Sequence, residues 1–157
     1  MSTPSRFVSL TTIPTSPPHD DRAARRVSPL RDVLAGDVAD ELQRILDHHD
    51  PATTNLYLYR PSSSVAAARG GTLTGLWPSE RRRALGRVLL ALPDGVEVVP
   101  VQLLTYPMAV ISQEHPVSTL GAEAVAAAER LGATLWVWEG DDGPGMHSAA
   151  AMVGPVA

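Results

Sequence analysis

Apolar residues recur every three to four positions between Leu30 and His49, and charged residues fill the positions between them. This spacing places the apolar side chains on one side of a helix, so it predicts an amphipathic helix over Leu30–His49. Glycine is a weak helix former, and Gly36 indicates a break within this helix. Pro51 should end it.

The same periodicity predicts two later helices. Pro78 suits the first position of a helix whose apolar stripe continues until Pro93 stops it. Ser118 can cap a second helix that runs to Leu131, and Gly132 is placed to terminate it.

Alternation with a period of two predicts β-strands. It is clearest over Asn55–Arg60 and over Thr134–Glu139. Val96–Leu104 and Met108–Ser112 are rich in β-branched and other apolar residues and are also predicted as strands. Pro100 cannot donate to a ladder, so the Val96–Leu104 strand should be an edge strand or bulged.

The resulting order predicts an α+β domain with the ferredoxin-like βαββαβ arrangement, an antiparallel sheet and an extra N-terminal helix. Residues 62–75 should form a loose hairpin that turns at Gly70 and Gly71, although other α+β arrangements with this hairpin remain open. Residues 1–26 are rich in Pro, Ser and Thr and predict a mobile, disordered N-terminal arm, which leaves 27–157 as a single α/β domain.

The composition excludes several kinds of catalytic chemistry. All thirteen residues counted as Lys or Arg are arginines, and there is no cysteine, so Schiff-base, P-loop lysine and thiolate chemistry are excluded. The net charge of −4 disfavours an extended nucleic-acid surface. Without a secretory leader or a long apolar run we expect a cytoplasmic protein, and the Ala-rich, Lys-free composition is typical of a GC-rich bacterial or phage genome.

The predicted strands bring four aromatic residues together. Tyr57 and Tyr59 on one strand, and Trp136 and Trp138 on its neighbour, would share one face of the sheet. An uncovered face of this kind would bind a protein partner or a second copy of the chain, or a small apolar ligand. The alternative is that the helix over Leu30–His49 covers the rings as ordinary core.

A basic cluster forms the second candidate site. Arg81, Arg82, Arg83 and Arg87 lie at or near the start of the predicted helix, after a glycine-rich segment. Helix N-termini bind anions, so the cluster predicts a phosphate or carboxylate site, or a docking surface for an acidic partner. The alternative is that the arginines are solvated, that Glu80 offsets one of them, and that their stems cover apolar surface.

The string Asp141-Asp142-Gly143-Pro144-Gly145-Met146 resembles the aspartate and glycine box of the histidine-kinase and gyrase type of ATPase. In that family the aspartate reads the adenine amino group, and the resemblance would imply nucleotide binding here. The helix over 118–131 lacks the magnesium-binding asparagine of that family. A turn whose residues tolerate left-handed backbone explains the string without nucleotide binding.

Histidines are the remaining candidates for chemistry. His48 and His49 are adjacent, so their rings diverge on a helix, and we expect them to contact its last carbonyls rather than a metal. His115 and His147 could each act as a general base. No cofactor or metal site is predicted, and catalysis stays open.

The leading hypothesis is a non-catalytic interaction or assembly module that presents an aromatic sheet face to a protein partner or to its own copy in a homo-oligomer. The alternative is a small enzyme or ligand-binding protein that holds an anionic molecule at the arginine-rich helix N-terminus. A nucleic-acid binder is the weakest of the three, and no membrane partner is expected.

Overall fold

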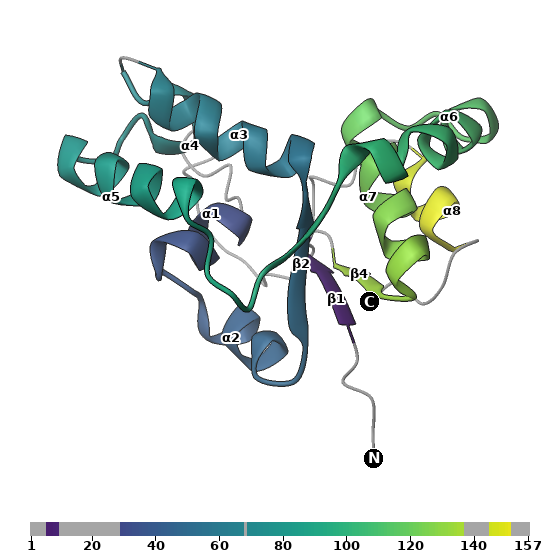
Figure 1. The fold of residues 1–157 in the computed structure, drawn as a ribbon, viewed down its shortest axis with the longest axis horizontal. Helices are drawn as coiled ribbons and strands as arrows, with labels where there is room; N and C mark the ends of the chain where they lie inside the picture. The colour runs from purple at the N-terminus through teal and green to yellow at the C-terminus, as the bar shows by residue number, and fades with distance from the viewer. Residues whose placement is uncertain (1–5, 10–28, 68, 137–144, 152–157) are drawn as a thin grey trace, which may run out of the picture.

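A parallel β-sheet lies between two groups of helices in the computed structural model, which describes residues 6–9, 29–67, 69–136 and 145–151 (Figure 1). The strands are β1 (Arg6–Ser9), β2 (Asp50–Thr54), β3 (Glu97–Val99) and β4 (Thr134–Trp136). Their order in the sheet is β3-β2-β1-β4, and every neighbouring pair is parallel. β1, the first strand among the described residues, therefore occupies an inner position in the sheet.

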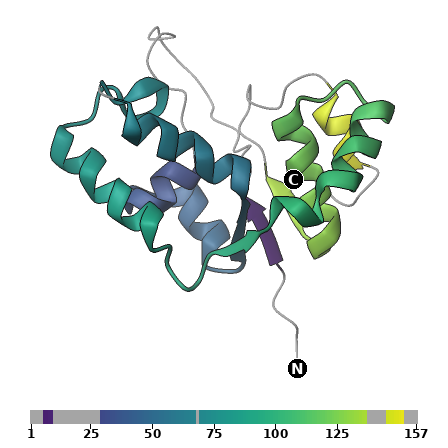
Figure 2. The same ribbon diagram turned by 45° about the horizontal axis from the view of Figure 1, so that its top comes forward.

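The earlier helices of the chain lie on one side of the sheet, and the later helices lie on the other side. On one side lie α1 (Pro29–Ala35), α2 (Asp40–Leu46), α3 (Asn55–Ala66), α4 (Gly71–Thr74) and α5 (Ser79–Leu90). On the other lie α6 (Thr105–Glu114), α7 (Thr119–Leu131) and α8 (Met146–Ala151), after a short 3₁₀ helix, η1 (Val101–Leu103). Figure 2 shows the same separation after rotation. None of the described helices is long and apolar enough to cross a bilayer.

The predicted antiparallel ferredoxin-like βαββαβ sheet is wrong, because the structure is mostly helical and its strands are parallel. Within the span predicted as a mobile arm, Arg6–Ser9 forms β1, and the rest of residues 1–26 lies outside the described residues. Strand β2 occupies Asp50–Thr54, between the predicted helix over Leu30–His49 and the predicted strand over Asn55–Arg60, where no element is predicted. The sequence therefore predicts neither β1 nor β2.

Two predicted strands are helices. Residues Asn55–Arg60 begin α3, whose buried positions Tyr57, Pro61 and Ser64 follow the helical spacing of four and three residues. The alternation of Leu and Tyr over residues 56–59 hides the helical spacing in the sequence, because Leu56 and Leu58 are both only partly buried and Tyr59 is exposed. Met108–Ser112 belongs to α6. The strand prediction fails here because a short apolar run has no periodicity that distinguishes a strand from a helix.

Other predictions are confirmed. The helix over Leu30–His49 is broken at Gly36, which has a φ of 70°, into α1 and α2. Ser118 caps α7 by accepting a hydrogen bond of 3.0 Å from the Gly121 N–H. Gly132 ends the same helix in the left-handed conformation, with a φ of 57°.

The predicted hairpin at residues 62–75 is also replaced by helix. Gly70 has a φ of 81° and joins α3 to the short helix α4 rather than turning between strands. The Val96–Leu104 strand is shortened to β3, which is an edge strand as Pro100 predicted, and the chain after Pro100 turns into η1.

Helix α7 is the centre of the second group of helices. All eight residues from Gly121 to Ala128 are buried, and five of them are alanines. It packs on β1, β2 and β4 and is covered by α6 and α8. Small side chains are required here because a helix buried on several sides must approach its neighbours closely. At Gly121, for example, a Cβ atom would lie 3.0 Å from the end of Met146 on α8.

We expect Ala127→Leu to lower the free energy of unfolding by about 1–3 kcal/mol, because its side chain would enter a filled space. Ala127 is fully buried in α7. The matched control is Ala109→Leu on the exposed side of α6, which should change stability by less than about 0.5 kcal/mol. Urea denaturation of the two variants measures both values, and equal losses would contradict this account of the packing.

Candidate functional site

The four aromatic residues of the predicted sheet face are not gathered on the sheet. Tyr57 and Tyr59 lie on α3, where the Tyr57 ring is buried and the Tyr59 side chain is 67% exposed. Trp136 is the last residue of β4, and Trp138 lies outside the described residues. The structure therefore removes the geometric basis for an aromatic sheet face at the two tyrosines.

The arginines of α5 divide into two pairs with different surroundings. Arg81 is held on the inner side by a 2.7 Å ion pair with Asp37 and by its guanidinium carbon, 3.9 Å from the centre of the Trp77 ring. Arg31 of α1 also lies over that ring, at 5.0 Å. The indole is thus contacted by two guanidinium groups, and cation–π attraction joins α1 to the start of α5.

Arg31 is fixed by further contacts. Its guanidinium forms a 2.6 Å ion pair with Asp32 and donates a hydrogen bond of 2.7 Å to the carbonyl oxygen of Leu73. Burial raises the pKa of the Asp32 carboxyl, and the hydrogen bond and charge of Arg31 oppose that rise. Arg31 therefore acts as a structural link between α1 and α4.

Arg82 lies across the turn at Gly70. A Cβ atom on Gly70 would be 2.7 Å from an Arg82 Nη1 atom and 2.6 Å from the carbonyl oxygen of Thr74, so this turn has no room for a side chain. Ser64 Oγ accepts hydrogen bonds from the N–H groups of Leu73 and Thr74, at 3.1 and 3.0 Å. Arg81 is therefore occupied in linking α5 to Asp37 after α1. Arg82 donates a hydrogen bond of 3.3 Å to Ser79 Oγ of its own helix, and its Nε atom is buried without a hydrogen-bond partner among the described residues.

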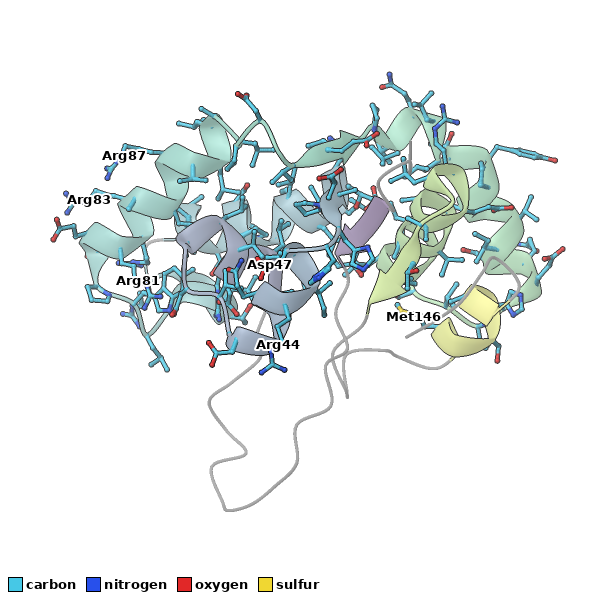
Figure 3. All side chains as sticks on the ribbon, turned by 90° about the horizontal axis from the view of Figure 1, so that it is seen from below. Arg44, Asp47, Arg81, Arg83, Arg87 and Met146 are labelled. Carbon is cyan, nitrogen blue, oxygen red and sulfur yellow. The ribbon has the colours of Figure 1, made fainter. Side chains whose placement is uncertain are left out.

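Arg83 and Arg87 form the second pair, on the outer side of α5. Figure 3 shows both side chains directed away from the molecule, whereas Arg81 points back toward α1. Both are exposed, and no ion pair holds either of them within the part of the chain that the structure describes. Glu80 does not pair with them there either. Leu90, which is 90% exposed, continues the same side of the helix.

We call Arg83, Arg87 and Leu90 the α5 stripe. The four candidate arginines do not converge on one anion, because Arg81 is directed to Asp37 and Trp77 and Arg82 lies over Gly70, whereas Arg83 and Arg87 are directed to solvent. The stripe presents two positive charges and one apolar side chain without a partner among the described residues.

A pocket of about 300 Å³ lies on the opposite group of helices, open to solvent. Its wall combines apolar and charged side chains: Tyr106, Pro107, Val110, Ile111, Glu114, His115, Glu129 and Ala149. We call it the α6–α8 pocket. His115 ends α6 and is one of the predicted general bases, but no Ser or Thr hydroxyl lines the pocket beside it.

The other sequence candidates do not assemble a reaction centre among the described residues. The His48 ring Nδ1 atom lies 2.8 Å from the carbonyl oxygen of Arg44, which confirms the expected contact with the end of the helix. No group of three or more metal-ligating side chains occurs within the described ranges. Of the string that resembles an ATPase box, only Gly145 and Met146 are described, where Gly145 lies against Pro116 at the start of α8.

Sequence reasoning missed Glu123, a fully buried carboxylate in α7. It accepts a hydrogen bond from Thr54 Oγ1 at the end of β2, and another of 3.2 Å from the N–H of Leu56 in the first turn of α3. Burial raises the pKa of the Glu123 carboxyl, and these two donors oppose the rise. A lone acid within the alanine-rich apolar run from Gly121 to Ala128 is the signal that the sequence offers.

Comparison with known protein families and with curated proteins finds no match to this chain. The assignment of function therefore rests on the geometry of the α5 stripe and the α6–α8 pocket.

We expect Glu123→Ala to lower the free energy of unfolding by about 2–4 kcal/mol, because it leaves the Thr54 hydroxyl and the Leu56 N–H buried without an acceptor. Glu123→Gln should stay within about 1 kcal/mol of the wild type, since its amide oxygen still accepts. Urea denaturation at neutral pH measures both, with Glu129→Gln as an exposed control on the same helix.

The pH dependence of the same variants tests the state of the carboxyl. The folded pKa of Glu123 is raised, so above about pH 4 the unfolded chain loses this proton first and the folded chain binds more protons. The free energy of unfolding of the wild type should therefore fall, relative to that of Glu123→Gln, as the pH is raised from about 4. A difference between the two proteins that is constant with pH would refute the shift.

Proposed function

We propose that the protein is a non-catalytic interaction module that docks an acidic, partly apolar segment of a protein partner on the α5 stripe. The observation that carries this proposal is the arrangement of Arg83, Arg87 and Leu90. They occupy positions i, i+4 and i+7 of one helix, so they lie on the same side. All three are exposed, with no ion pair among the described residues.

The charge pattern selects the class of partner. Two guanidinium groups about one turn apart bind carboxylates through charge-assisted hydrogen bonds, often with two contacts each. The neighbouring Leu90 side chain loses exposed apolar surface when a partner covers it. A helix with acidic residues on successive turns and one large apolar residue would satisfy all three side chains.

The alternative of a small anionic ligand at the N-terminus of α5 has less support. Arg81 already pairs with Asp37, and Arg82 is packed over Gly70. Arg83 and Arg87 are directed away from the molecule, so they do not complete an anion site with Arg81 and Arg82 (Figure 3). A nucleic-acid partner would need more phosphate contacts than two arginines provide on a chain of net charge −4.

The test is a binding titration with a fluorescein-labelled synthetic helix that carries glutamates on successive turns and one leucine. We expect saturable binding to the full chain, and a loss of roughly two- to thirtyfold in affinity for the double variant Arg83→Gln, Arg87→Gln, since exposed ion pairs contribute about 0.2–1 kcal/mol each. Fluorescence anisotropy measures both.

Arg44→Gln is the matched control, because Arg44 is an exposed arginine in the last turn of α2 as Arg87 is in α5. It should leave binding unchanged, and a peptide with glutamine in place of glutamate should not bind. Equal binding of the double variant and the wild type would refute the proposal. Preferential binding of a single-stranded oligonucleotide of the same charge would replace it with the nucleic-acid alternative.

A further inference from the structure

The α6–α8 pocket collects two carboxylates from different helices. Glu114 is the last residue of α6, and Glu129 lies near the end of α7, yet both line the same hollow. Both side chains are exposed, and neither takes part in an ion pair within the described part of the chain. The wall of the pocket therefore includes two carboxylates that have no ion-pair partner among the described residues.

Apolar surface accompanies these charges. Tyr106 is 79% exposed and Val110 is 38% exposed, which places two large apolar side chains at the rim. A cationic head on an apolar stem matches such a wall, because the stem covers the apolar atoms while the head meets the carboxylates. At about 30 Å³ per water molecule, a pocket of about 300 Å³ has room for an arginine side chain.

We propose that a second copy of this chain supplies that arginine, so that the α5 stripe of one copy docks in the α6–α8 pocket of the next. This inference rests on the proposed function, and it names the acidic partner of the stripe. The complementarity is direct: Arg83, Arg87 and Leu90 on one surface face Glu114, Glu129 and Tyr106 on the other.

The positions of the two surfaces decide between one copy and two. Helix α5 lies at one end of the longest axis of the molecule, and α6 and α8 lie at the other (Figure 1). The stripe of a chain cannot reach the pocket of the same chain, so the contact must be made between copies.

The contact joins two different surfaces, so it is heterologous. Each copy that docks its stripe leaves its own pocket free, and association continues until a ring closes or an open chain forms. A symmetric dimer that stops at two copies does not follow from this geometry.

Sedimentation velocity of the full chain over a range of concentrations tests the inference. We expect the wild type to grow beyond a dimer as the concentration rises. The stripe variant, Arg83→Gln with Arg87→Gln, and the pocket variant, Glu114→Gln with Glu129→Gln, should each weaken self-association by roughly two- to thirtyfold, since exposed ion pairs contribute about 0.2–1 kcal/mol each. The control variant Arg44→Gln with Asp94→Asn changes exposed charges outside both surfaces and should associate as the wild type does.

Mixing the two variants gives the decisive measurement. The stripe variant keeps an intact pocket, and the pocket variant keeps an intact stripe, so an equimolar mixture should form a heterodimer and stop there. A mixture that stays monomeric, or a pocket variant that still associates as the wild type does, overturns the inference.

The outcomes also separate this inference from the proposed function. A wild-type chain that stays monomeric at all concentrations, but binds the acidic peptide through Arg83 and Arg87, refutes docking between copies and leaves the stripe as a site for another protein. Absence of both self-association and peptide binding refutes both. Because all four substitutions are at exposed positions and keep the side chain polar, circular dichroism should show unchanged helix content in each variant.

Discussion

The buried carboxylate of Glu123 is the contact on which the arrangement of the two helical layers depends. It belongs to α7, on one side of the sheet, and it binds the end of β2 and the start of α3, which lies on the other side. Removing a carboxylate from water is costly, and the hydrogen bonds of Thr54 and Leu56 offset only part of that cost. The position of α3 relative to α7 is therefore specified by a polar contact inside an apolar interface, which tolerates few alternative arrangements.

Helix α7 makes this contact possible because its side chains are small. The alanines around Glu123 allow the helix to lie close to β1, β2 and β4, so that the carboxylate reaches the end of β2. On the other side of the sheet the layer is held differently, by two guanidinium groups on the Trp77 ring and by the hydrogen bonds of Ser64 around Gly70. The layer around α7 is joined by close packing of alanines. In the other layer, polar and cation–π contacts add to the packing of buried side chains such as Leu30, Leu34 and Leu85.

The sequence predicted elements that carry strong local signals and failed where a residue's meaning depends on its neighbours in space. Ser118 and Gly132 bound α7 as predicted, because capping is decided by a few adjacent residues. The strands were misplaced because β1 and β2 are short, and because Pro51 in β2 and Pro61 in α3 argue locally against the structures that contain them. Of the candidate site, the sequence identifies the arginines. It does not separate Arg81 and Arg82 from the solvent-directed Arg83 and Arg87, because that separation depends on Asp37 and Gly70, which the tertiary structure brings near.

The inner position of β1 has a consequence for how the chain folds during synthesis. Residues Arg6–Ser9 are synthesised before both of their neighbours in the sheet, β2 and β4, and more than a hundred residues separate them from β4. The register pairs Phe7 with Thr134, so the sheet closes only through a contact between distant parts of the chain. Contacts of this separation slow folding, and they leave β1 as an unpaired strand edge while the rest of the chain is translated.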